Sequence, residues 1–204
     1  EKFSVAAWVQ AVESYRPEYA TIPPAALQML LDAEVPPDRI ASVRYITGGG
    51  ARLDPALQQA FEARYGARIL WGYGATEFCG TAASWTAELY ERFYPDKRGS
   101  VGRALAGIGL RIVDPETGAE LPAGSRGLIE AHIPAVQPGW IRTTDIGEID
   151  SDGFLYHHGR ADGAIVRGGF KIMPETIVAA LRRFPGVVDA GIAALPHRRL
   201  GPIR

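Results

Sequence analysis

Residues 68–74 read Arg68-Ile69-Leu70-Trp71-Gly72-Tyr73-Gly74, a short apolar run that ends in two glycines around a tyrosine. Bulky apolar residues closed off by glycine are typical of a buried strand that ends in a turn. The clearest helix pattern of the chain, 54–65, comes just before this run, with Asp54 as its N-cap and Gly66 as a left-handed stop. A helix followed directly by a buried strand indicates a parallel sheet covered by helices.

The same alternation runs through the earlier part of the chain. Helical spacing covers 3–16 and 25–31, whereas strand-like runs cover 19–22 and 43–46. We therefore predict an α/β fold over residues 1–98, with a parallel sheet and flanking helices.

After Gly99 the pattern changes to short strands separated by turn clusters. Strand-like runs at 110–113 and 127–133, and a hairpin around the turn 150–153, predict a small antiparallel, barrel-like β subdomain over 99–161. The β subdomain would complete a large N-terminal domain, residues 1–161.

A third pattern begins near residue 162. A strand at 164–167, a helix at 174–184 and a strand at 187–195 indicate the start of a small α+β C-terminal domain, residues 162–204.

Composition excludes several classes of function. The chain has 204 residues with 22 basic and 23 acidic side chains, so it lacks the surplus of positive charge that nucleic-acid binding requires. No apolar run approaches the ~18–20 residues of a membrane helix. The single cysteine, Cys79, can form neither an internal disulfide nor a thiolate metal site. We expect a cytoplasmic protein without a membrane span or a nucleic-acid partner.

Four local features could carry chemistry. Two are glycine-containing turns that directly follow strands, 47–51 and 71–77, and such turns at the carboxyl ends of strands are where open α/β sheets bind ligands. The other two are Thr143-Thr144-Asp145, before a hairpin, and Gly159-Arg160-Ala161-Asp162, where the fold pattern changes.

Each feature also has a purely structural interpretation. The turn 47–51 matches neither the phosphate-loop nor the dinucleotide spacing. Tyr73 could be a core residue, Glu77 a capping carboxylate, and Asp145 with Arg160 a structural ion pair. Chance occurrence of all four features in this order is far less probable than any one alone.

The ordered set of motifs resembles the signature of the adenylate-forming superfamily, which contains acyl-CoA synthetases, peptide-synthetase adenylation domains and beetle luciferases. The most specific element of the resemblance is Gly72-Tyr73-Gly74-Ala75-Thr76-Glu77. The resemblance covers nearly the whole chain, and it implies an enzyme that activates a carboxylic acid with ATP and then forms a thioester with CoA.

The resemblance also implies roles for individual residues. The backbone of Gly49, Gly50 and Ala51 would line the adenine and acyl pockets, and Gly72 and Gly74 would flank the adenine-stacking ring of Tyr73. Thr76 would bind the α-phosphate, Glu77 would bind Mg²⁺, Asp145 would bind the ribose hydroxyls, and Arg160 would bind ribose and phosphate oxygens. Asp162 would be the hinge, and Gly168 and Gly169 would line the path of CoA.

The catalytic residues implied in this way are Thr76, Glu77 and Arg160. His157 stands where the family often packs adenine, although His157 and His158 could equally be a plain strand pair. Relative to the family pattern, the chain lacks the N-terminal phosphate loop and the C-terminal catalytic lysine, so we expect the chain to be an interior fragment that is inactive alone.

Three functions remain open from the sequence. Ser4 stands where amino-acid-activating domains usually carry an aspartate, which favours a plain carboxylic acid and therefore an acid–CoA ligase. The alternatives are an adenylation domain that loads a carrier protein and a non-catalytic AMP-binding module. The expected partners are the acid and CoA, and a homodimer is left open.

Overall fold

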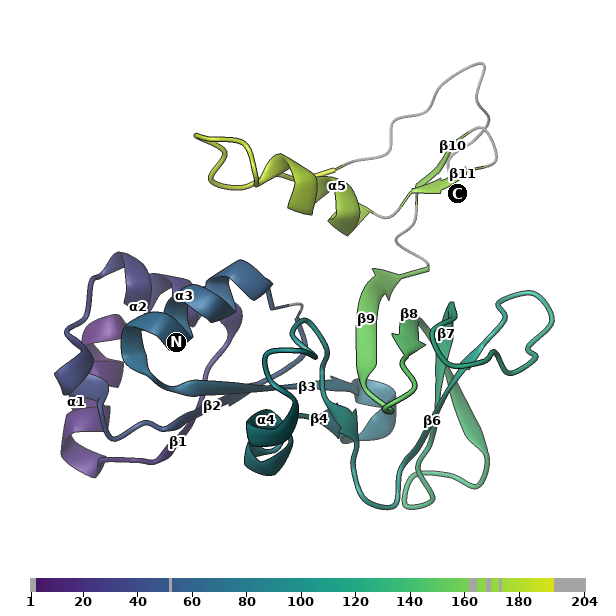
Figure 1. Ribbon diagram of the computed structural model, residues 1–204, viewed down its shortest axis with the longest axis horizontal. Coiled ribbons are helices and arrows are strands. Elements are labelled where there is room, and N and C mark those ends of the chain that lie inside the picture. Colours follow the sequence, from purple (N-terminus) through teal and green to yellow (C-terminus); the bar gives the residue numbers. More distant parts are fainter. Residues whose placement is uncertain (1–2, 52, 162–164, 168–169, 173, 193–204) are drawn as a thin grey trace.

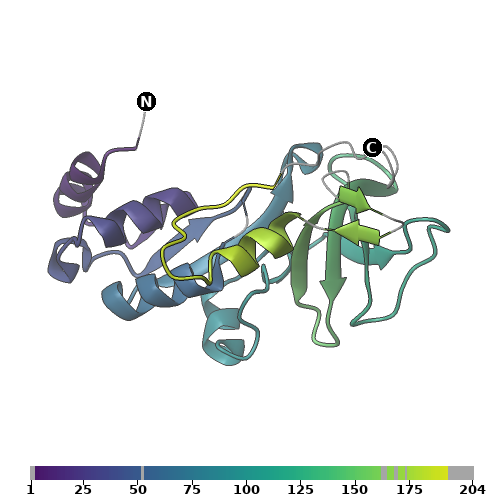
Figure 2. The same ribbon diagram turned by 90° about the horizontal axis from the view of Figure 1, so that it is seen from above.

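Most of the described strands belong to two β-sheets in the computed structural model (Figure 1). The structure describes residues 3–51, 53–161, 165–167, 170–172 and 174–192. Figure 2 shows the purple and blue helices of the first part at one end of the long axis and the green strands at the other. The mixed α/β fold predicted from the sequence is confirmed.

The first part of the chain alternates helices and strands as predicted. Its elements are α1 (Val5–Tyr15), β1 (Tyr19–Thr21), α2 (Pro24–Asp32), the 3-10 helix η1 (Pro37–Ile40), β2 (Tyr45–Gly48), α3 (Pro55–Tyr65) and β3 (Arg68–Ala75). The Asp54 carboxylate accepts a hydrogen bond from the backbone N–H of Ala56 (2.8 Å), and Gly66 ends α3 with φ 70°. β1, β2 and β3 are parallel neighbours.

The sheet then continues with elements that the sequence did not reveal. They are the 3-10 helix η2 (Thr76–Phe78), β4 (Gly80–Ser84), α4 (Ala87–Phe93) and β5 (Arg103–Ala104). β4 pairs antiparallel with β3, and β5 pairs antiparallel with β4. Ala82 and Ala83 are fully buried, so β4 is built from small residues and lacks the bulky pattern that predicts a strand.

The second sheet is antiparallel throughout and contains β6 (Gly109–Val113), β7 (Arg126–His132), β8 (Trp140–Ile149) and β9 (Leu155–Arg160), in that order. The turn 150–153 joins β8 to β9 as expected, with Gly153 at φ 82°. Within the described residues β6 and β9 do not pair with each other, so the sheet is open and does not close into a barrel.

The last described elements are the antiparallel pair β10 (Ile165–Arg167) and β11 (Phe170–Ile172), followed by α5 (Pro174–Leu181). In Figure 1 they stand apart from the two large sheets. The strand predicted over 187–195 is wrong for its described part, 187–192, which pairs with none of the described strands. Without a partner among the described strands, this apolar run does not form the hydrogen bonds of a strand.

Two hydrophobic cores position the site, and β3 contributes to both. The first core packs α1, α2 and α3 on β1–β3 and includes Val9, Leu27, Ile46, Phe61, Ile69 and Trp71. The second lies against β6–β9 and includes Tyr73, Phe78, Ala83, Ile112, Ile129 and Leu155. No helix among the described residues is long and apolar enough to cross a membrane.

Candidate functional site

A cavity of about 1030 Å³ opens where β3 meets β8 and β9. Its lining includes the predicted site residues Gly49, Gly50, Ala51, Gly72, Tyr73, Gly74, Thr76, Glu77, Asp145 and Arg160. These residues are distant in sequence but converge on one hollow. Cofactor pockets usually enclose about 300–1,000 Å³, so this cavity has room for a nucleotide together with a small second molecule.

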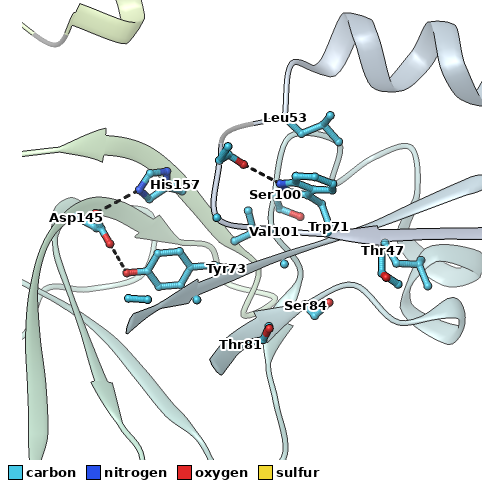
Figure 3. Close-up of a pocket in the computed structure, with 18 of the residues that line it drawn as sticks. Thr47, Leu53, Trp71, Tyr73, Thr81, Ser84, Ser100, Val101, Asp145 and His157 are labelled. Atoms are coloured by element: carbon cyan, nitrogen blue, oxygen red, sulfur yellow. Dashed lines mark hydrogen bonds and ion pairs between the residues drawn. The ribbon is translucent and has the colours of Figure 1, made fainter. Parts of the chain in front are cut away.

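Tyr73 connects the two sheets at the centre of the cavity (Figure 3). Its phenol donates a hydrogen bond of 2.6 Å to the Asp145 carboxylate on β8. The His157 ring on β9 is stacked near the Tyr73 ring, with 5.6 Å between centroids and 28° between planes. Burial, together with the hydrogen bond to Asp145, raises the pKa of Tyr73 well above its ordinary value, so the phenol stays protonated and remains the donor.

Asp145 is held as a carboxylate by its neighbours. Burial alone would raise its pKa, but hydrogen bonding to His157 and Tyr73 outweighs burial and the net pKa is lowered. His157 Nε2 lies 3.6 Å from the second carboxylate oxygen. Arg160 stands directly opposite Asp145 in the β8–β9 register, and its charge also lowers the pKa of Asp145. An ionised carboxylate is an acceptor only, which suits a ligand with hydroxyl donors.

The glycines around Tyr73 have a structural reason to be there. A Cβ added at Gly74 would lie 2.4 Å from the carbonyl oxygen of Gly80, and one at Gly72 would lie 3.0 Å from that of Ala83. Both glycines therefore let β4 approach β3. In the turn after β2, a Cβ at Gly49 would lie 3.0 Å from the Gly72 carbonyl oxygen, whereas Gly50 has φ 74° and open space beside it. The turn thus presents bare backbone to the cavity.

Thr76 and Glu77 lie on η2, directly after β3, and both are exposed to the cavity. No group of three or more His, Cys, Asp or Glu side chains among the described residues could hold a metal ion by itself. Mg²⁺ in phosphate sites commonly takes only one or two carboxylates and completes its shell with phosphate oxygens and water. The single carboxylate of Glu77 fits that arrangement.

Three predicted residues cannot be placed. Asp162, Gly168 and Gly169 lie outside the described residues, so the structure does not test the hinge or the path of CoA. Arg160 is the last of the predicted site residues that the structure describes, and it ends β9 at the rim of the cavity.

Several residues that line the cavity were not among the predicted site residues. Trp71, Leu53 and Thr47 lie on the other side of Tyr73 from Asp145, and Thr81 and Ser84 face the same region from β4 (Figure 3). Their side chains are apolar or carry hydroxyls, which resembles an ordinary core or strand surface. Thr47 and Trp71 begin the two glycine-containing turns and Leu53 follows the first of them, so this position was the one available signal.

Comparison with known proteins agrees with this geometry. Residues 1–140 match the family model described as AMP-binding enzyme. Over the whole chain, 27% of residues are identical to 4-coumarate–CoA ligase 1 of Petroselinum crispum, and the match covers 40% of that ligase. The chain therefore spans about two fifths of the length of this relative.

Solved structures show the same similarity. The ATP-bound MatB of Rhodopseudomonas palustris matches 97% of the chain with a TM-score of 0.84 and 28% identity, and the match covers 41% of that structure. The o-succinylbenzoate CoA synthetase MenE of Bacillus subtilis, in complex with its acyl-adenylate intermediate, matches 98% of the chain with a TM-score of 0.81 and 25% identity, over 43% of that structure. The family model, the fold and the converging site residues together show that the chain belongs to the AMP-binding enzyme family, whose adenylate-forming signature the motifs resemble.

Proposed function

We propose that the protein containing this chain activates a carboxylic acid with ATP and transfers the acyl group to CoA. The observation that carries this proposal is the convergence of Tyr73, Glu77, Asp145 and Arg160 on one cavity. Relatives named as CoA ligases, and the solved complex with an acyl-adenylate, support the same chemistry.

Each residue at the nucleotide end of the cavity has a physical role in this proposal. The Tyr73 ring offers its face to the adenine, with the His157 ring beside it. Asp145 accepts hydrogen bonds from the ribose hydroxyls, and Arg160 donates to ribose and phosphate oxygens. Thr76 donates to the α-phosphate. Glu77 binds Mg²⁺, which when present neutralises phosphate charge.

The proposed reaction has two steps. A carboxylate oxygen of the acid attacks the α-phosphorus of ATP, the bond from that phosphorus to the bridging oxygen breaks, and pyrophosphate leaves. The CoA thiolate then attacks the acyl carbon, and AMP leaves with the former carboxylate oxygen. The protein's share is positioning and charge stabilisation, because adenylation itself supplies the good leaving group.

The division of the chain follows from the same proposal. Residues 1–161 would belong to the large adenylation domain, and residues 162–204 would begin a mobile domain that rotates about Asp162 between the two steps. Gly168 and Gly169 would line the approach of CoA in the second step. Protease sensitivity around residue 162 that changes between the ATP-bound and CoA-bound states would support this division.

The test is an acid screen on the complete polypeptide with ATP, Mg²⁺ and CoA, measuring AMP and acyl-CoA. We expect both products, and we expect Asp145→Asn to raise the KM for ATP about tenfold to a hundredfold, since hydrogen bonds to a charged group contribute roughly 1.5–3 kcal/mol. Glu88→Gln is the control, because that side chain is 80% exposed and remote from the cavity.

The other outcomes are distinct. Pyrophosphate release with acyl transfer only to a carrier-protein thiol would indicate the carrier-loading function instead. AMP binding without pyrophosphate release from any acid would indicate a binding module and overturn the proposal.

A further inference from the structure

Trp71 fills the space beneath the glycine-rich turn at the end of the cavity away from Asp145 (Figure 3). The side chain is 3% exposed, and its indole N–H donates a hydrogen bond of 2.9 Å to the carbonyl oxygen of Ala51. The ring lies so close to Gly48 that a Cβ there would be 2.2 Å from a ring carbon. The indole therefore occupies the volume that a side chain at residue 48 would take.

The position of the indole is fixed on two sides. The hydrogen bond to Ala51 ties the ring to the turn, and the first hydrophobic core, which includes Ile46 and Ile69, packs around Trp71. A ring held by a hydrogen bond and by close packing cannot turn aside without losing that hydrogen bond and leaving a void in the core. Trp71 is therefore a rigid wall.

The two ends of the cavity differ in charge. Glu77, Asp145 and Arg160 line the end that the proposed function assigns to the nucleotide. The other end, around Trp71, is lined by uncharged side chains, which include those of Thr21, Thr47, Leu53, Thr81 and Ser84. An uncharged wall suits an uncharged substrate tail, because a buried charge without a partner is costly.

We propose that Trp71 sets the length limit of the acid subsite, so that the protein takes short monocarboxylic acids with an uncharged tail. This inference rests on the proposed function, because the acid must reach the α-phosphate and so must occupy the part of the cavity that the nucleotide leaves free. Trp71 is thus a specificity-determining residue that acts by filling space.

The test compares variants of the complete polypeptide in binding acyl-sulfamoyladenosines, stable analogues of the acyl-adenylate, by calorimetry. The tails are acetyl, butyryl, hexanoyl and octanoyl, with adenosine sulfamate as the analogue without a tail. In the wild type we expect affinity to fall roughly tenfold or more per step once the tail meets Trp71, because a single methylene is worth about 10- to 200-fold in an apolar pocket. Trp71→Leu should move the maximum to a longer tail and raise octanoyl affinity at least about tenfold.

The chain offers a matched control. Trp85 is also buried, at 5% exposure, and its indole N–H also donates to a backbone carbonyl, that of Ser100 (3.0 Å). It belongs to a third hydrophobic core, together with Tyr45, Leu70 and Phe154, and does not line the cavity. Trp85→Leu should therefore lower thermal stability without changing the order of tail preference. Trp71→Phe, which keeps a ring but loses the hydrogen bond, should retain the preference for short tails.

Three results are decisive. A tail profile that is the same in wild type and Trp71→Leu would overturn the inference, provided that both bind adenosine sulfamate. An equal shift of the profile in Trp85→Leu would also overturn it, because general loosening would then be the cause. Failure of the wild type to bind adenosine sulfamate would count against the proposed function itself.

Discussion

Glu130, on β7, is only 4% exposed and lies between two arginines. Its two oxygens accept hydrogen bonds from Arg111 (2.7 Å) and Arg142 (2.7 Å), which stand on the neighbouring strands. Burial alone would raise the pKa of Glu130, but these hydrogen bonds outweigh burial and the net pKa lies below its ordinary value of 4.5. A lowered pKa means that the carboxylate stabilises the fold above about pH 4.5, and that this stabilisation is lost as the pH falls through the lowered pKa.

We expect Glu130→Gln to reduce the free energy of unfolding by about 1–3 kcal/mol at neutral pH, because two guanidinium groups lose their counter-charge. The difference from wild type should shrink as the pH falls below that ordinary value. Urea unfolding of both proteins, from neutral pH to below the ordinary pKa of the carboxyl group, measures this difference in the free energy of unfolding. Glu91→Gln is the control: Glu91 pairs with Arg68 but is 61% exposed, so its removal should cost at most about 1 kcal/mol. Equal costs for the two variants would contradict the prediction.

Some residues of the cavity stand in motifs that the sequence shows directly, and one depends on strand pairing. Tyr73, Glu77, Asp145 and Arg160 stand in short motifs whose side-chain chemistry can be read locally. For His157 the sequence left adenine packing and a plain strand pair equally open, because this residue reaches the cavity through the pairing of β8 with β9, whose register shifts between Ile146 and Gly147. A register shift changes which residues lie opposite one another and has no local sequence signal.

The pairing of β3 with β4 can be tested through its glycines. A Cβ at Gly74 would meet the Gly80 backbone at 2.4 Å, whereas Gly80 has open space around its own Cα. We expect Gly74→Ala to destabilise the fold by about 1–3 kcal/mol or more, because backbone cannot yield as a flexible side chain does. Gly80→Ala should stay within about 0.5 kcal/mol. Thermal unfolding of both variants measures the difference in stability. A small loss of stability in Gly74→Ala would show that the two strands separate easily.

Elements with local signals were predicted well. α3 was located through Asp54 and Gly66, and both residues make the expected caps. α4 was missed even though Thr86 caps it, with the backbone N–H of Leu89 donating to its hydroxyl, because the helix has no fully buried residue and so no clear apolar stripe. Helices and strands that are stabilised mainly by their neighbours have a weaker sequence pattern than helices with their own capping residues.

The described residues form a helix-covered sheet and an antiparallel sheet, as the sequence indicated, and the cavity lies between these two sheets. The sequence could not show how the two sheets meet. Their meeting depends on the direct hydrogen bond from Tyr73 to Asp145, and on backbone bonds from Val101 to Leu155 and from Leu155 to Gly102, which link segments more than 50 residues apart in the chain. Contacts of such long separation are set by packing in three dimensions and not by any local pattern.

The eight residues of β3 place Ile69 and Trp71 in one core and Tyr73 in the other. Opening this strand would expose the side chains that β3 contributes to both cores. Its amide protons can therefore reach solvent only when the molecule unfolds globally. In deuterium exchange we expect the amides of β3 to be the slowest described positions, with a common opening free energy on both sides of Gly72. Faster exchange at Tyr73 than at Ile69 would show instead that the two cores open independently of each other.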